Sequence, residues 1–192
     1  MTDTPMNPMN QAMNPTEPLK PNTSGMLRLF VYGTLKRGFW NHDRFCRGVL
    51  AIEDALVRGR LFETSSGIPV LQVPEEDILA VGTTNPLADV ATQAHVTARL
   101  FTPQSTIINP QYEGAPWGPV YGELLTFDDP ENRLPAIDRL EGFHPGGPCL
   151  YRRVLIPVRT KETVLPTWLY VGFHSIERGL QPLGSSQWPR NG

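Results

Sequence analysis

The sequence predicts an α+β domain with a curved or barrel-like mixed β-sheet and a few short helices beside it. Strand candidates stand near both ends of the chain with helix candidates scattered between them, so no regular alternation supports a doubly wound parallel sheet. Two strand candidates contain an internal glycine, Gly59 and Gly122, which is typical of bulges or bends in a curved or closed sheet. The 20 prolines and 17 glycines among 192 residues favour turns and loops over long helices.

The N-terminal segment, residues 1–25, differs in composition from everything that follows. It is rich in Pro, Met and Asn and contains no Phe, Trp, Tyr, Val or Ile. Such a segment buries too little apolar surface to offset the entropy of ordering, so it predicts a disordered arm. Residues 27–35 (LRLFVYGTL) are then mostly apolar, β-branched or aromatic, which predicts a strand buried on both faces.

The other strand candidates share this composition. They are residues 56–63 (LVRGRLFE), 68–73 (IPVLQV), 120–127 (VYGELLTF), 151–158 (YRRVLIPV) and 167–173 (TWLYVGF). We therefore expect one domain over residues 26–178. Residues 179–192 are again rich in Gly, Pro and Ser and predict a loose C-terminal tail.

Residues 74–118 form a long connection between two strand candidates. Within it, residues 75–80 and 85–93 predict short helices, and residues 96–101 are a possible strand. A connection of this length in a compact domain is typical of a functional lid or a mobile loop, and the sequence does not decide between them.

The clearest helix is expected between Pro130 and Glu141. Pro130 fits a first helical position, but Pro135 would interrupt a helix interior, so the main helix is predicted to begin near Pro135. Gly142 then supplies a stop signal at the C-terminal end.

Charge and composition exclude several classes of protein. Lys plus Arg (17) nearly balances Asp plus Glu (19), which argues against a nucleic-acid partner or an anionic membrane surface. Two cysteines, Cys46 and Cys149, are too few for a disulfide framework or a Cys-rich zinc site. With neither a long apolar span nor a signal-peptide pattern, the expected location is cytoplasmic. The four histidines lack metal-site spacing, so no metal site is predicted.

Glu141 is the first candidate for chemistry, because it falls on the apolar face of the expected helix. Leu134, Ile137 and Glu141 are spaced to share that face. The other charged residues of the helix are expected to point elsewhere: Glu131, Asp138 and Arg139. Burial would raise the pKa of the Glu141 carboxyl, which suits a general acid or base near neutral pH. The alternative is a helix-end glutamate that reaches solvent.

The second candidate is the end of the first strand, residues 30–38 (FVYGTLKRG). Gly33 ends a buried strand and allows successive backbone N–H groups to converge on an anion, and Thr34 adds a hydroxyl. A substrate carboxylate is the natural guest. The alternative is an ordinary strand end with a turn glycine.

These segments together resemble the γ-glutamyl cyclotransferase-like superfamily, most closely its γ-glutamylamine cyclotransferase-like branch. The motifs are FVYGTLKRG at 30–38 followed by Asn41 and His42, VYGELLTF at 120–127, DRLEGF at 138–143, LYRRVLIPV at 150–158 and WLYVGF at 168–173. They cover most of residues 26–173. The arm and the 74–118 insertion fall outside the pattern.

The resemblance implies a small mixed β-barrel with flanking short helices and a metal-free active site. Glu141 would be the general acid/base, and Tyr151 would lie near the substrate pocket. The substrate's α-carboxylate would be bound by the loop Tyr32, Gly33, Thr34 and Leu35. Further candidates from the matched segments are Arg37, Asn41, His42 and Arg153. The insertion HPGG at 144–147 separates Glu141 from Tyr151 and leaves the roles of Tyr151 and Arg153 open.

The implied reaction is an acyltransferase-type or lyase-type cyclisation without a cofactor. A γ-glutamyl α-amine attacks its own γ-carbonyl and releases 5-oxoproline with an amine or amino acid. One alternative is a small-ligand binding or protein-interaction module on the same barrel, and another is an amide hydrolase in which Glu141 activates water. The leaving group, the oligomeric state and the role of the added segments are left open by the sequence.

Overall fold

The computed structural model describes residues 25–100, 116–172 and 179–189. The predicted arm therefore lies outside the described residues except for Gly25, as do residues 101–115 of the insertion and the last three residues of the tail. The elements in chain order are β1 (Leu27–Val31), α1 (Trp40–Phe45), β2 (Ala51–Glu63), β3 (Pro69–Gln72), η2 (Glu75–Asp77), β4 (Ala80–Val81), α2 (Pro86–Leu100), β5 (Gly118–Phe127), α3 (Pro130–Glu141), β6 (Tyr151–Arg159), β7 (Val164–Gly172) and β8 (Gln181–Pro182).

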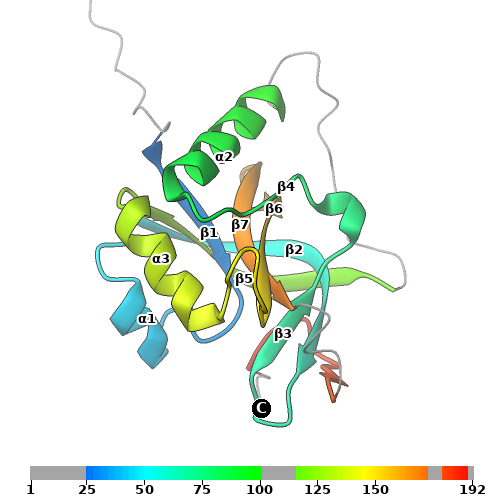
Figure 1. Cartoon of the computed structure of the whole chain (residues 1–192). Helices are drawn as coiled ribbons and strands as arrows, with labels where there is room; N and C mark the ends of the chain where they lie inside the picture. The colour runs from blue at the N-terminus through cyan, green and yellow to red at the C-terminus, as the bar shows by residue number, and fades with distance from the viewer. Residues whose placement is uncertain (1–24, 101–115, 173–178, 190–192) are drawn as a thin grey trace, which may run out of the picture.

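Five strands close into a mixed barrel in the order β2-β5-β1-β7-β6, and β6 pairs back to β2 through Leu56 and Arg159. Four of these pairings are antiparallel, whereas β1 runs parallel to β7 where Leu29 faces Trp168. β3 and β8 extend the sheet from β2, and β4 extends it from β6 (Figure 1). The predicted α+β class with a small mixed barrel and flanking helices is confirmed.

β1 is buried on both faces, as its composition predicts, because it separates two apolar cores. Leu27, Leu29 and Val31 pack with α3 and the outer face of the sheet, whereas Phe30 belongs to the barrel interior. This alternation follows from the period of two along a strand. The strand is shorter than expected and ends at Val31, so the residues that follow form a loop.

Gly122 allows two barrel strands to approach closely. A Cβ at this position would lie 2.6 Å from Cζ of Phe30 and would also meet the carbonyl oxygen of Val31. The register between β2 and β5 continues one-to-one through Gly122, which pairs with Ala55. The glycine therefore serves close packing rather than a bulge.

α3 begins at Pro130 and contains Pro135 in its interior, so the predicted start near Pro135 is wrong. Leu134 and Ile137 are fully buried, and burial of each stabilises the fold by about 1.5–3 kcal/mol. That gain matches or exceeds the cost of about 3 kcal/mol for an interior proline. The expected stop is confirmed at Gly142, whose φ of 61° is left-handed.

Much of the 74–118 insertion is regular structure packed on the barrel. Residues 75–80 form the short η2 and the start of β4 rather than one helix. α2 continues beyond the expected end at residue 93. It also takes in residues 96–100 of the strand expected at 96–101, whose last residue lies outside the described residues. Asp89, Val90 and Gln93 bury one face of this helix at helical spacing. The side chain of Gln93 also accepts from the backbone N–H of Arg28 at 3.0 Å, which attaches α2 to β1.

The C-terminal segment also contacts the body of the domain, where the sequence predicted a loose tail. β8 pairs with β2 through Gln181 and Glu63. The ring of Trp188 lies 5.3 Å from that of Phe39, and its indole N–H donates to Glu63 at 3.0 Å. These contacts are tertiary and leave no local signal in the sequence.

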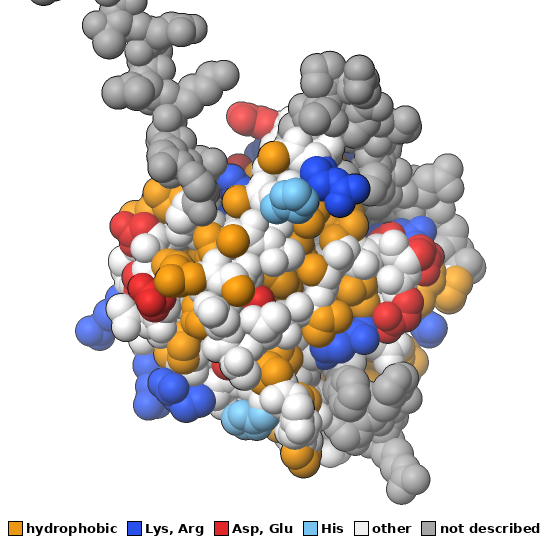
Figure 2. Space-filling view, turned by 45° about the horizontal axis from the view of Figure 1, so that its top comes forward, with side chains coloured by type: hydrophobic (Ala, Val, Ile, Leu, Met, Phe, Trp, Pro, Cys, Tyr) orange, Lys and Arg blue, Asp and Glu red, His pale blue; other side chains and the backbone are white. Residues whose placement is uncertain are grey.

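The described surface mixes charges of both signs. On the face in Figure 2, acidic, basic and hydrophobic side chains alternate without a field of one sign, as expected from the near-balanced composition. Among the helices of the described ranges, none combines the length and apolar character needed to cross a lipid bilayer.

Candidate active site

A small cleft of about 50 Å³ opens where β1 ends. Its walls come from the loop after β1, the start of β3, the last turn of α3 and the facing ends of β6 and β7. The side chains that matter for chemistry are those of Tyr32, Thr34, Glu141, Tyr151 and Tyr170. The structure thus brings together Glu141, Tyr151 and the whole loop Tyr32–Leu35, which are distant in the sequence.

The carboxyl of Glu141 is partly buried. Among the described residues, none donates a hydrogen bond to it or forms an ion pair with it. Burial, and to a smaller extent the negative charge of Asp138, raise the pKa of Glu141 from 4.5 to about 7. At neutral pH the group therefore populates both its acidic and its basic form, as acid–base catalysis requires.

The loop opposite Glu141 presents unused backbone donors. It turns through a hydrogen bond of 3.1 Å from the N–H of Lys36 to the carbonyl oxygen of Gly33. Within the described part of the chain, the N–H groups of Gly33, Thr34 and Leu35 have no acceptor. Successive free N–H groups of this kind make an anion-binding concavity.

α1 supports this loop from behind. The side-chain amide of Asn41 donates to Oγ1 of Thr34 at 2.7 Å, and Nδ1 of His42 lies 2.8 Å from the carbonyl oxygen of Leu35. Because a carbonyl only accepts, Nδ1 carries the proton. Asn41 and His42 therefore hold the loop, and neither lines the cleft.

The tyrosines of the cleft have their hydroxyl groups occupied. Tyr32 donates to the carbonyl oxygen of Tyr170 at 3.0 Å and accepts from the N–H of Leu71 at 3.2 Å. Tyr151 donates to the carbonyl oxygen of Pro69 at 3.2 Å. Burial raises the pKa of both phenols above the ordinary value, so they remain neutral and shape the walls.

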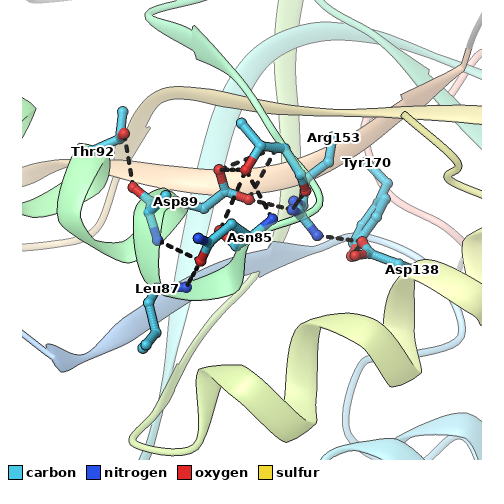
Figure 3. Close-up of polar contacts among 9 residues, drawn as sticks. Asn85, Leu87, Asp89, Thr92, Asp138, Arg153 and Tyr170 are labelled. Carbon is cyan, nitrogen blue, oxygen red and sulfur yellow. Dashed lines mark hydrogen bonds and ion pairs between the residues drawn. The ribbon is translucent and has the colours of Figure 1, made fainter. Parts of the chain in front are cut away.

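Arg153 does not reach the cleft, although the resemblance made it a candidate. Its side chain is fully buried and forms ion pairs with Asp89 of α2 and Asp138 of α3, and it also donates to the carbonyl oxygen of Thr83 at 2.8 Å (Figure 3). The hydroxyl of Tyr170 donates to Asp138 at 2.6 Å. The guanidinium therefore joins the insertion to the helix that carries Glu141.

Asp138 does not line the cleft, as the helix-face interpretation expected, but it pairs with Arg153 and accepts from Tyr170, contacts that the sequence did not indicate. The carboxyl is only partly exposed, and burial raises its pKa while the nearby Arg153 lowers it. The spacing of three residues between Asp138 and Glu141 was the available signal, because i and i+3 are neighbours on a helix. Asp89 and Tyr170 were also missed, since their contacts with Arg153 and Asp138 depend on tertiary packing.

Arg37 lies outside the cleft as well. Its side chain is exposed and forms ion pairs with Glu123 at 2.9 Å and Asp54 at 3.2 Å. It lines a different, larger cavity. Across the ranges that the structure describes, no group of three or more His, Cys, Asp or Glu side chains is placed to hold a metal ion.

Comparisons with known proteins place these segments within a family model. A family model described as gamma-glutamyl cyclotransferase, AIG2-like, matches residues 29–91 and 83–190. Similar solved structures are YkqA from Bacillus subtilis (20% identity, TM-score 0.49) and an AIG2-like protein from Mus musculus (19% identity, TM-score 0.42). The match to YkqA covers 85% of this chain but only 39% of the length of YkqA. The match to the mouse protein covers 76% of each chain. A search of curated proteins returned no match.

Proposed function

Since the chain belongs to the gamma-glutamyl cyclotransferase, AIG2-like family, we propose that it cyclises a γ-glutamyl compound with Glu141 as general acid and base. In this reaction the α-amine of the γ-glutamyl group attacks its own γ-carbonyl carbon. A new C–N bond closes the ring of 5-oxoproline, and the original C–N bond to the leaving amine or amino acid breaks.

One observation carries this proposal. Among the described residues the Glu141 carboxyl has no hydrogen-bond or ion-pair partner, and burial raises its pKa to about 7. It lines the same cleft as a loop whose three successive N–H groups have no acceptor in the described part of the chain. A proton-transfer group and an anion-binding group are the two parts that the cyclisation needs, because the substrate carries its own nucleophile next to an α-carboxylate.

The proposed sequence of steps uses each part once. The N–H groups of Gly33, Thr34 and Leu35 bind the α-carboxylate, which orients the neighbouring α-ammonium group. Glu141 in its ionised form removes a proton from that ammonium and frees the electron pair for attack on the γ-carbonyl. Glu141 then gives that proton to the leaving nitrogen as its bond to carbon breaks, and the attacking nitrogen loses its second proton to solvent, which leaves the neutral lactam N–H.

Positioning supplies the rest of the rate enhancement. Holding the amine against its own γ-carbonyl makes the attack intramolecular, and effective molarities of about 10⁵ M or more are reached in well-oriented cases. The cleft of about 50 Å³ is small, so we expect the leaving group to extend outward from it. Tyr32 and Tyr151 keep the walls in place because their hydroxyl groups are already hydrogen bonded.

The test is product analysis with a panel of γ-glutamyl amines and γ-glutamyl dipeptides. We expect 5-oxoproline from the wild-type protein and from Glu131→Gln, a matched control on the exposed first turn of α3. Glu141→Gln should lose at least about 100-fold in rate, within the range of general acid–base catalysis.

Other outcomes would contradict the proposal. Free glutamate in place of 5-oxoproline would indicate a hydrolase. Saturable binding of the panel without any product would indicate a binding module, and full activity of Glu141→Gln would remove Glu141 from the mechanism.

A further inference from the structure

A second, larger cavity lies at the other side of the loop that follows β1. Its volume is about 720 Å³, within the range of about 300–1,000 Å³ that is usual for small-molecule sites. It shares no lining residue with the Glu141 cleft. Its walls are formed by the residues after Leu35, parts of β2 and β5, the end of β6 and the C-terminal segment.

Positive charge is in excess around this cavity. Four cationic side chains line it, against the two carboxylates of Asp54 and Glu123. Both carboxylates form ion pairs with a single one of those cations, Arg37. Lys36 is not ion paired with either carboxylate, so an anionic ligand would be favoured beside it.

Lys36 is the most informative of these cations, because only 6% of its surface is exposed. Its ammonium donates to the carbonyl oxygen of Trp188, and no carboxylate of the described residues lies within ion-pair distance. Burial lowers the pKa of Lys36, and the negative charge of Glu123 opposes this shift in part without forming an ion pair. An ammonium has three donors, and a ligand anion would supply both a counter-charge and a second acceptor.

The wall beside Lys36 is held in place by specific contacts. The ring of Trp188 lies tilted against that of Phe39, with 5.3 Å between the ring centres, and its indole N–H donates to Glu63 at 3.0 Å. The Lys36 ammonium lies 5.9 Å from the ring centre of Phe39. Lys36, Phe39 and the C-terminal segment thus form one connected wall.

Aromatic surface completes the cavity. Phe39 and Tyr121 both line it, and 44% of the Tyr121 surface is exposed. Exposed aromatic faces favour a flat apolar group, and the anionic end of the same ligand would lie at Lys36.

We propose that this cavity is a binding site for a small organic anion with a flat apolar body, with Lys36 as its counter-ion. The site is separate from the Glu141 cleft and does not depend on turnover there.

The test uses 2-naphthoate as the probe, measured by calorimetry with the full-length protein. We expect saturable binding of naphthoate. Naphthalen-2-ylmethanol, which lacks the charge, and acetate, which lacks the apolar body, should each bind at least about tenfold more weakly. Lys36→Gln should weaken naphthoate binding by about tenfold or more. Arg139→Gln, an exposed change on α3, should bind as the wild type does.

Two further variants keep the proposal falsifiable. Tyr121→Ala should weaken naphthoate binding by about threefold or more even where Lys36→Gln fails to fold. Glu141→Gln should bind naphthoate with unchanged affinity, whether or not Glu141 is catalytic. Absence of binding at millimolar naphthoate, equal affinity for the alcohol, or loss of binding in Glu141→Gln would each overturn the proposal.

Discussion

Two carboxyl groups one turn apart on α3 have opposite environments. Asp138 accepts from Tyr170 and pairs with the fully buried Arg153, which in turn pairs with Asp89. Glu141 lines a cleft, and no described residue is hydrogen bonded to it. The Asp138 carboxylate therefore holds α3 in place, whereas the Glu141 carboxyl is available for the proposed proton transfer.

The two environments also have opposite consequences for stability. Removing a partner from the Asp138 network leaves buried charge uncompensated, which is costly. The ionised form of Glu141 is already uncompensated, so its neutralisation should stabilise the fold. The variants below test this contrast.

The largest effect is expected from Arg153→Met. The change leaves Asp89 and Asp138 without their cation, which should lower the free energy of unfolding by about 3–5 kcal/mol. Urea denaturation measures this loss. Arg139→Met, on the exposed face of the same helix, should change stability by less than about 0.5 kcal/mol. Equal effects of the two variants would contradict a structural role for Arg153.

Glu141→Gln should stabilise the protein at alkaline pH. The pKa of Glu141 is raised from 4.5 to about 7, so the folded state binds the extra proton between these values and stability falls as pH rises through that window. The amide variant avoids this loss and should be more stable by at most about 3 kcal/mol at pH 8, with no difference near pH 4. Denaturation at the two pH values measures it, and destabilisation at pH 8 would show that Glu141 has a structural partner.

Asp138→Asn should change both the stability of the fold and the pKa of Glu141. Losing a charged acceptor of Arg153 and Tyr170 should cost about 1–3 kcal/mol in stability. Because the charge of Asp138 raises the pKa of Glu141, the variant should also move the acid limb of the pH–rate profile to lower pH. The profile of kcat/KM checks this, and a limb that moves to higher pH would contradict it.

Tyr170→Phe should have the smallest effect. It removes only the hydroxyl that donates to Asp138 and leaves the backbone carbonyl that accepts from Tyr32. A loss of about 1–1.5 kcal/mol is expected in thermal or urea unfolding. A loss as large as that of Arg153→Met would mean that the hydroxyl, rather than the guanidinium, holds the network together.

The fold was predictable where local pattern and tertiary packing agree. The alternation of β1 and the apolar runs of the other barrel strands are visible in the sequence, and so is the stop at Gly142. Prediction failed at Pro135 inside α3, where packing outweighed the local preference of proline. It also failed at β8, a two-residue strand that forms only by pairing with β2.

The candidate site shows the same division. The position of Glu141 in the cleft was predictable because a carboxyl on an apolar helix face is unusual, and that of the loop was predictable from Gly33 after a buried strand. Their roles in chemistry stay predictions. Asp138 lies beside that apolar face on the helix. Its contacts with Arg153 and Tyr170 come from distant parts of the chain and could not be read from the helix pattern. The pairing of Arg153 with Asp89 required α2, whose packing against the barrel has no signature in the sequence.

The most direct test of the central claim is a titration of the Glu141 carboxyl itself. Carboxyl-¹³C glutamate labelling, with Glu141→Gln used to assign the signal, follows its ionisation by NMR. The structure predicts a midpoint near pH 7, since burial raises the pKa to about 7. A midpoint near 4.5, the ordinary value for this group, would show that Glu141 is a solvated helix-end residue and would contradict its proposed role as general base.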